Sequence, residues 1–362
     1  MKMIHCADLH LDSKLNANLS KEKAKMRRSE LLDTFMRLVS YASENDIKAV
    51  LIAGDLFDRK TVSAAARNLV YGVINSNPDT VFYYLKGNHD DNAFFEAPEN
   101  LKLFGSDWTS YRMEDEEIVI TGVELDDENS ADIYSKLVLS PQDINIVMLH
   151  GQLSDYAGKD RAEVINLGAL KNKSIDYLAL GHIHERRTGV LPPRGEYCYP
   201  GCLEGRGFDE CGRHGFELLD IDVKEKRVSH KFIPFAKRTL HLVSVDVNGV
   251  MTTAEIINAV EDALEGRDIP PEDMVKIELT GKVDVECEKD PEQVRVRFER
   301  DYYFVRVSDE TSIAVDYDSF MKDASLKGEF VRILKADESL DEERRSAIIR
   351  CGIQALSGEE WQ

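Results

Sequence analysis

The first 235 residues alternate short apolar segments with longer stretches whose apolar residues recur every three or four positions. Short apolar runs bounded by polar or turn-forming residues are typical of buried β-strands. The expected strands are residues 2–6, 48–53, 80–85, 117–121, 145–149, 176–180, 216–223 and 227–234. Strands that alternate with helices, followed by consecutive strands, predict a layered α/β domain.

Two helices are expected between the early strands. Leu31, Phe35 and Leu38 share one face at helical spacing between the first two strands. Residues 62–74 repeat this spacing between the second and third strands. The apolar stripe of this second helix is open to two interpretations, a contact with another copy of the chain or ordinary core.

The pattern changes after Pro234. Residues 240–247, 274–282 and 302–307 have the character of strands, and residues 253–264 have that of a helix. Beyond Tyr317, apolar residues stand at helical intervals among many charged ones. The sequence therefore predicts three parts, namely a domain at 1–235, a small α+β domain at 236–317 and a helical segment at 318–362.

The composition fits an intracellular protein of about two domains. The chain has 362 residues, of which 43% are hydrophobic, and domains average ~150 residues. No apolar run approaches the ~18 residues of a membrane helix, and the amino end lacks an apolar stretch of signal-peptide length. Six cysteines without a C-x-x-C pair suit reduced thiols. We expect a cytoplasmic protein without membrane contact.

The charge balance bears on nucleic-acid binding. Acidic residues number 67 and basic residues 46, which gives a net charge of −21. Such a chain is a poor nonspecific binder of nucleic acid over its whole surface. The acidic excess is uneven, because residues 159–213 are nearly balanced. The charge balance therefore does not exclude a local basic surface that binds DNA.

Metal-binding residue types follow several of the expected strands. They are Asp8, His10, Asp55, Asp58, Asn88, His89, Asp90, His150, His182 and His184. Ligands of open α/β sheets collect at the carboxyl ends of strands. Carboxylate, amide and imidazole donors without thiolate suit Mn²⁺, Fe²⁺ or Zn²⁺ better than a structural zinc site, and Mg²⁺ is a further option. So many donors indicate two ions roughly 3.5–4 Å apart that share a carboxylate, an arrangement for displacement at phosphorus.

The motifs D-x-H, G-D-x-x-D, G-N-H-D, H-G and G-H-x-H, in this order, resemble those of the calcineurin-like metallophosphoesterases. Within that superfamily the chain is similar to DNA-repair exonucleases of the SbcD type. Cys202 after Tyr-Pro-Gly, and the loop 205–208, resemble a YhaO-like side branch. The resemblance implies a four-layer αββα sandwich, a small α+β capping domain and a helical carboxyl-terminal tail.

The resemblance also implies roles for individual residues. One ion is held by Asp8, His10 and His184, the other by Asn88, His150 and His182, and Asp55 bridges them. His89 faces the substrate and protonates the leaving oxygen, while Asp90 holds its ring and Asp58 supports the ligands from behind. Arg186, Arg187 and Arg206 lie near the metal loops in sequence and are candidates for phosphate contacts.

The implied activity is that of a Mn²⁺-dependent DNA phosphodiesterase, a 3′→5′ exonuclease with endonuclease activity. It would act in DNA repair with an SbcC-like coiled-coil ATPase, which docks on the tail 318–362, and as a homodimer. Tail helices that pack on their own domain are the alternative. A phosphoesterase for small substrates, such as cyclic nucleotides or phosphomonoesters, is the second hypothesis, and a non-catalytic scaffold is the third. The complete ligand set argues against the scaffold.

Several histidines and cysteines lie outside these motifs. The histidines are His5, His214, His230 and His241, which we interpret as structural. A thiolate cluster of Cys198, Cys202 and Cys211 is conceivable, but the C-x₃-C spacing is atypical of metal sites. Structural thiols are the favoured interpretation.

Overall fold

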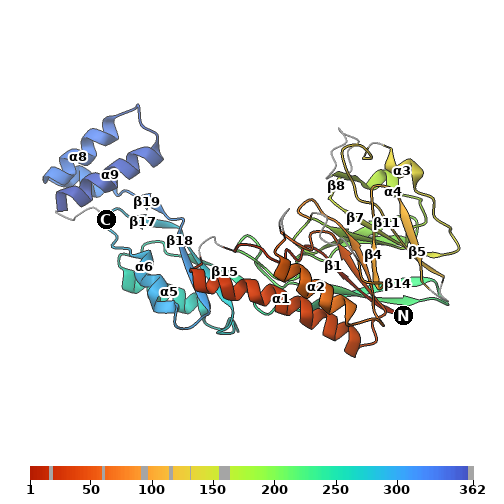
Figure 1. The fold of residues 1–362 in the computed structure, drawn as a ribbon. Helices are drawn as coiled ribbons and strands as arrows, with labels where there is room; N and C mark the ends of the chain where they lie inside the picture. The colour runs from red at the N-terminus through yellow and green to blue at the C-terminus, as the bar shows by residue number, and fades with distance from the viewer. Residues whose placement is uncertain are drawn as a thin grey trace. The chain divides into compact units, whose positions relative to one another are not determined.

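The computed structural model describes residues 1–15, 19–58, 62–90, 97–113, 117–130, 132–154 and 164–357. The chain folds into two compact units, Met1–Thr239 and Leu240–Gln362 (Figure 1). Among the described helices, none combines the length and the apolar composition that a membrane crossing requires.

The first unit contains two six-stranded sheets, of which the first has the strand order β14-β13-β1-β2-β3-β4. Its strands are β1 (Lys2–Cys6), β2 (Ala49–Ala53), β3 (Val81–Leu85), β4 (Leu101–Leu103), β13 (Gly215–Asp222) and β14 (Arg227–Pro234). Strands β1 to β4 run parallel, whereas β13 and β14 are antiparallel to their neighbours.

The second sheet has the order β11-β12-β10-β7-β6-β5. Its strands are β5 (Thr109–Arg112), β6 (Ile118–Gly122), β7 (Ile144–His150), β10 (Tyr177–Gly181), β11 (Arg187–Leu191) and β12 (Gly195–Tyr199). Only its edge strands β5 and β11 pair antiparallel. A separate two-stranded ribbon joins β8 (Gln152–Ser154) to β9 (Val164–Asn166). Two mixed sheets with helices confirm the mixed α/β prediction.

Helices cover the outer faces of the two sheets (Figure 1). Helices α1 (Lys21–Glu44) and α2 (Ala64–Asn75) pack on the first sheet, and the short helices α3 (Ile133–Lys136) and α4 (Leu167–Leu170) pack on the second. The period of two along β1 explains the layering, because Ile4 and Cys6 pack toward the helices while Met3 and Ala7 lie between the sheets.

The helix expected at 62–74 begins at Ala64, because the Ser63 side chain accepts a hydrogen bond from the Ala66 N–H and caps it. Most of its apolar stripe packs against the core of the same chain. Ala66, Val70 and Ile74 are buried in the core under the first sheet.

The second unit is built on a parallel three-stranded sheet of β15 (Leu240–Asp246), β16 (Met274–Thr280) and β18 (Phe304–Asp309). Helices α5 (Thr253–Leu264) and α6 (Pro291–Phe298) complete its core. Strands β17 (Lys282–Asp284) and β19 (Ser312–Ala314) form a second pair. The helices α7 (Tyr317–Lys322), α8 (Leu326–Ala336) and α9 (Glu342–Ser357) follow.

The tail helices share a small core with the β17–β19 region. Val285 precedes them in the chain and packs with Phe320, Val331 and Ile349. Leu326 and Ile333 of α8 instead remain 69% and 61% exposed. The tail therefore has both a buried apolar face and exposed apolar side chains.

Candidate metal centre

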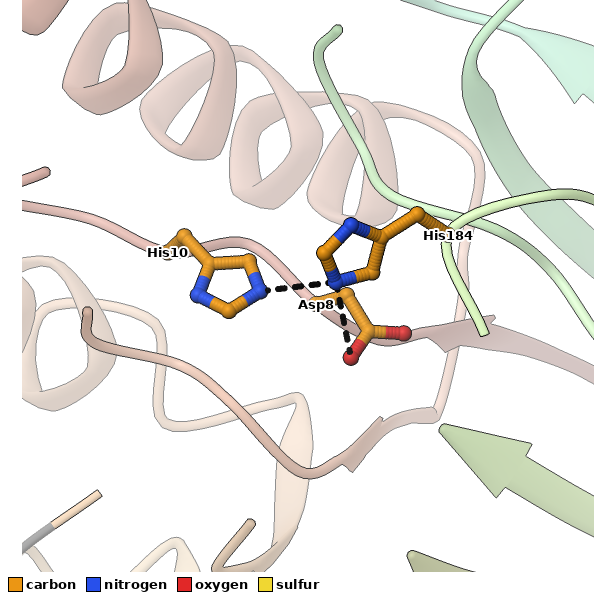
Figure 2. Close-up of side chains that lie close together, drawn as sticks. All are labelled: Asp8, His10 and His184. Carbon is orange, nitrogen blue, oxygen red and sulfur yellow. Dashed lines mark hydrogen bonds and ion pairs between the residues drawn. The ribbon is translucent and has the colours of Figure 1, made fainter. Parts of the chain in front are cut away.

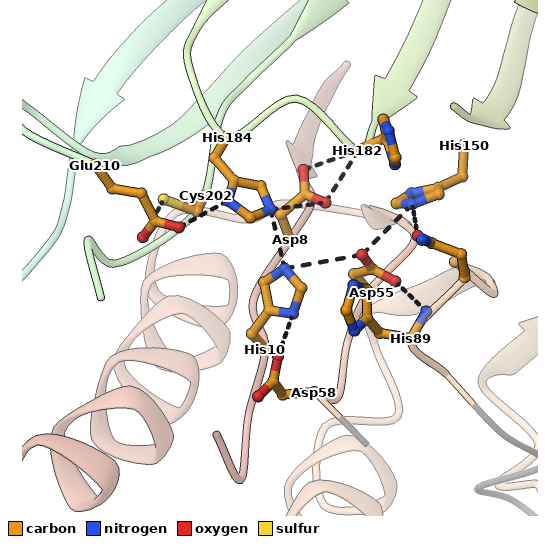
Figure 3. Close-up of polar contacts among 12 residues, drawn as sticks. Asp8, His10, Asp55, Asp58, His89, His150, His182, His184, Cys202 and Glu210 are labelled. Atoms are coloured by element: carbon orange, nitrogen blue, oxygen red, sulfur yellow. Dashed lines mark hydrogen bonds and ion pairs between the residues drawn. The ribbon is translucent and has the colours of Figure 1, made fainter. Parts of the chain in front are cut away.

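Loops that follow β1, β2, β3, β7 and β10 bring the expected ligands together (Figure 3). The strands belong to both sheets, and their carboxyl ends meet at one edge of the sandwich. The candidate metal centre consists of Asp8, His10, Asp55, Asn88, His150, His182 and His184.

Asp8, His10 and His184 form the first donor group (Figure 2). The Nε2 atoms of His10 and His184 lie 3.1 Å apart. The Nε2 atom of His184 also lies 4.0 Å from Oδ1 of Asp8. Two imidazole nitrogens that converge beside a buried carboxylate suit a divalent cation, which accepts a lone pair from each.

Asp8, Asp55 and His150 form the second donor group. Nε2 of His150 lies 3.5 Å from Oδ2 of Asp55 and 3.1 Å from Oδ1 of Asn88. Its Nδ1 lies 3.0 Å from the Ala53 carbonyl and donates to it. This backbone bond fixes the tautomer, so that Nε2 is available as a ligand.

Asp55 stands between the two groups. Its Oδ2 atom is 3.5 Å from Nε2 of His150 and 3.8 Å from Nε2 of His10. Its Oδ1 atom accepts the backbone N–H of His89 at 3.0 Å. His182 joins the second group, since its ring lies 5.3 Å from that of His150, centroid to centroid.

Four candidate ligands adopt left-handed backbone conformations. The φ angles are +52° at Asp8, +46° at His10, +49° at Asp55 and +100° at His182. Such angles are uncommon outside glycine, and backbone strain of this kind collects at functional sites. The strands end abruptly at these residues and turn their side chains toward one another.

Glycine is required beside two of the ligands. A Cβ atom on Gly54 would lie 2.0 Å from Nδ1 of His150, and one on Gly87 would lie 2.2 Å from Oδ1 of Asp55. Neither position has room for a side chain while the ligand keeps its place. The G-D and G-N-H-D motifs therefore have a steric basis.

The electrostatics favour a bound cation. Asp8 and Asp55 are 1% and 2% exposed. Burial raises the pKa of Asp8. Burial also opposes ionisation of Asp55, but the hydrogen bond and charge of His150 outweigh it and lower the pKa of Asp55. Two neighbouring buried carboxylates are costly unless positive charge compensates them.

His89 and Asp90 occupy different positions relative to the donors. The exposed His89 ring lies 5.3 Å from the His10 ring, centroid to centroid. The Asp90 carboxylate accepts the N–H groups of Gly87 and Phe57 at 3.0 and 2.8 Å. Asp90 thus joins the loops after β2 and β3, whereas we expected it to hold the His89 ring. Burial raises the pKa of Asp90 to about 6.

Behind the ligands lies a charged network that the sequence revealed only in part. Oδ1 of Asp58 lies 3.2 Å from Nδ1 of His10, and Oε1 of Glu210 lies 2.7 Å from Nδ1 of His184 (Figure 3). The guanidinium group of Arg206 lies between the two carboxylates, with Nη1 3.1 Å from Oδ1 of Asp58 and Nη2 2.8 Å from Oε1 of Glu210. Metal-binding histidines commonly donate their other ring N–H to a carboxylate, as Nδ1 of His184 does to Glu210. Glu210 had no signal in the sequence, because it follows no strand.

The three expected arginines have different surroundings. Arg206 is 18% exposed and bonded to Asp58 and Glu210. Arg186 donates to Glu217. Arg187 pairs with Glu185 and is 58% exposed. It also lines a pocket with Ile183, Tyr197 and Tyr199, next to the loop of His182 and His184.

Comparison with known proteins gives several relatives. The metallophosphoesterase YhaO of Bacillus subtilis is 28% identical over 72% of this chain and 67% of its own. The DNA double-strand break repair protein Mre11 of Methanopyrus kandleri is 24% identical over 99% of this chain and 82% of its own. One component of the nuclease SbcCD of Rhodobacter capsulatus is 27% identical over 50% of this chain. The present chain spans only 38% of that component's length.

The match to a protein family covers the amino-terminal part of the chain. Residues 1–186, which include all seven residues of the candidate metal centre, match the calcineurin-like phosphoesterases. The resemblance predicted from the five sequence motifs is thereby confirmed. This chain belongs to the calcineurin-like phosphoesterase family, whose members are typically hydrolases with two metal ions.

Proposed function

We propose that this protein is a Mn²⁺-dependent DNA phosphodiesterase with two ions at the metal centre. The observation that carries the proposal is the place of Asp55, a buried carboxylate within 3.8 Å of imidazole nitrogens from both donor groups. Two ions held there would supply Lewis-acid activation and charge stabilisation for in-line displacement at phosphorus. Oxygen and imidazole donors suit Mn²⁺, with Fe²⁺, Zn²⁺ and Mg²⁺ as the competing ions.

The proposed ligand sets start from the two donor groups and add Asn88 and His182, which lie next to His150. Asp8, His10 and His184 would hold one ion, Asn88, His150 and His182 would hold the other, and Asp55 would contribute to both. The carboxylates of Asp58 and Glu210 orient the rings of His10 and His184 from behind.

His89 is the proposed proton donor to the leaving oxygen. Its backbone N–H is fixed to Oδ1 of Asp55, so the side chain stays next to the bridging position. The ring is exposed, unlike that of His10, and can therefore reach a substrate. Asp90 fixes the loop that carries it through backbone hydrogen bonds. A positioned imidazole is a suitable general acid for an alkoxide leaving group.

DNA is the proposed substrate, with 3′→5′ exonuclease and endonuclease activity. The support comes from relatives named for DNA double-strand break repair and for a nuclease, one of which aligns with nearly the whole chain. The domain at 236–317 would act as a capping domain. Arg187, exposed beside the His182 and His184 loop, is the arginine best placed to contact a phosphate.

An SbcC-like coiled-coil ATPase is the proposed partner in DNA repair. The Rhodobacter relative is named as one subunit of a nuclease. Leu326 and Ile333 on α8 are apolar and exposed, and they would contact such a partner. We propose in addition that two copies of the chain form a homodimer near α2.

A substrate panel tests the proposed activity. Purified protein with Mn²⁺ is given end-labelled duplex DNA, single-stranded DNA and bis-p-nitrophenyl phosphate, and an Asp55→Asn variant serves as the inactive control. We expect wild-type protein to shorten DNA from the 3′ end and the variant to leave it intact. Cleavage of the small ester without any cleavage of DNA would instead identify a phosphoesterase for small substrates.

A further inference from the structure

A second group of metal-ligand side chains lies between the two sheets and shares no residue with the metal centre. Glu217 on β13 is the register partner of His5 on β1, and both side chains are fully buried. Cys198 on β12 packs in the core layer between the sheets. His230 on β14 completes the group.

Three donor atoms of different chemistry converge in this group. A sulfur of Cys198, a carboxylate oxygen of Glu217 and a ring nitrogen of His230 all lie within 4.8 Å of one another. Nδ1 of His230 is 2.8 Å from Oε2 of Glu217. Thiolate, imidazole and carboxylate are the donors that bind Zn²⁺ in proteins, and this combination differs from the thiolate-free metal centre.

The surrounding residues orient these donors as they do at metal sites. Nε2 of His230 lies 3.1 Å from Oε2 of Glu196, which leaves Nδ1 to face the group. Arg186 donates to the other oxygen of Glu217, Oε1. A histidine ligand that donates its second N–H to a carboxylate is common around protein-bound metals.

His5 and Tyr177 pack beside the group. Nδ1 of His5 lies 2.9 Å from the Tyr177 hydroxyl, and the Tyr177 ring lies 5.4 Å from the His230 ring, centroid to centroid. His5 and Tyr177 are both buried, so this side of the group is closed to solvent.

The buried charges of the group also suit a divalent cation. With Cys198 as thiolate and His230 neutral, the buried anionic groups would be Cys198 and Glu217, and one divalent ion would balance them. Arg186 and Glu196 flank the group and are 40% and 57% exposed, so solvent screens their charges.

We propose that Cys198, Glu217 and His230 bind a structural Zn²⁺ that links the two sheets. Cys198 belongs to the second sheet, and Glu217 and His230 belong to the first. Binding releases the thiol proton of Cys198 to solvent. The ion would cross-link the two sheets, whose strand ends carry the metal centre. This site does not depend on the proposed DNA phosphodiesterase activity.

Cobalt substitution of the full-length protein tests this site. Co²⁺ bound to a thiolate gives a near-ultraviolet charge-transfer band, and the proposed ligand sets of the metal centre contain no sulfur. We expect the band in wild-type protein and its loss in Cys198→Ser. Cys202→Ser is the matched control and should keep the band, although Cys202 is also buried and lies 3.2 Å from Nδ1 of His214.

Metal content measured by mass spectrometry supplies the second readout. Cys198→Ser should lose one zinc per chain and keep the ions of the metal centre. Wild-type protein without the band, when the metal centre is fully loaded, would overturn the proposal and leave a charged network without metal. A band that disappears in Cys202→Ser but persists in Cys198→Ser would overturn it as well.

Discussion

Asp55 is a single side chain on which the whole metal centre depends. It is 2% exposed, and its two oxygens contact His150, His10 and the backbone of His89. The G-D motif singled out Asp55 from sequence alone. Glu210 has a comparable role behind His184 but became visible only when the fold joined positions 26 residues apart.

The role of His89 is separable from metal binding. His89→Ala should keep both ions of the metal centre yet slow DNA cleavage by ~10²–10⁴-fold, as general acids contribute. The defect should shrink on bis-p-nitrophenyl phosphate, because nitrophenolate leaves without a proton. Rates on both substrates, with metal content by mass spectrometry, check this. A variant that loses metal, or cleaves DNA as fast as wild type, contradicts the assignment.

Glu210 is expected to act on metal affinity through His184. Glu210→Gln removes the charge that holds Nδ1 of His184 at 2.7 Å and should weaken Mn²⁺ binding by ~10–100-fold. Excess Mn²⁺ should restore much of the rate. The exposed Glu185, which pairs with Arg187, gives the matched control Glu185→Gln. Identical Mn²⁺ dependence in both variants would show that Glu210 does not support the ligand.

At the scale of elements, the regular strands and helices were the predictable part. Strands β2 and β10 are continuous apolar runs because both of their faces are buried. The short strands β4 and β5 were missed, since three or four partly exposed residues carry little periodic signal. Helix α6 was missed because apolar and charged residues alternate over 294–298 without helical spacing, and its start depends on the Asp290 cap and Pro291.

Two isoleucines of the tail separate stability from partner binding. Ile349 on α9 is fully buried, so Ile349→Ala should destabilise the second unit by ~2–5 kcal/mol. Ile333 on α8 is 61% exposed, so Ile333→Ala should leave thermal unfolding unchanged but weaken co-purification with an SbcC-like ATPase. Thermal melts of both variants measure stability, and pull-downs of both variants measure partner binding. Unchanged co-purification with Ile333→Ala would exclude this face of α8 as the docking site.

At the scale of the whole molecule, the net charge of −21 keeps most of the surface unfavourable for DNA. Any DNA path therefore depends on local features such as Arg187. The sequence located the metal centre because its ligands follow strands. It could not locate the Cys198, Glu217 and His230 group, whose members meet only when the two sheets stack.

Self-association is the second property of the whole molecule. The proposed homodimer predicts twice the chain mass of 41.0 kDa in light scattering at micromolar concentration. Much of the apolar stripe of α2 is buried in the core, but Tyr71 remains 38% exposed there. Tyr71→Glu should therefore shift the protein toward monomer. A wild-type mass of one chain would rule out stable pairing.

A Mn²⁺ titration of metal-free protein tests whether two ions at the metal centre drive DNA cleavage. Bound Mn²⁺ per chain and the rate of DNA cleavage are measured in the same samples, for wild type and for Asp55→Asn. Two Mn²⁺ ions should bind the wild-type metal centre, with cleavage rising as the second ion binds, and the variant should lose both binding and cleavage. Full occupancy by two ions without cleavage of DNA, or cleavage that survives in Asp55→Asn, would contradict the proposed two-ion DNA phosphodiesterase.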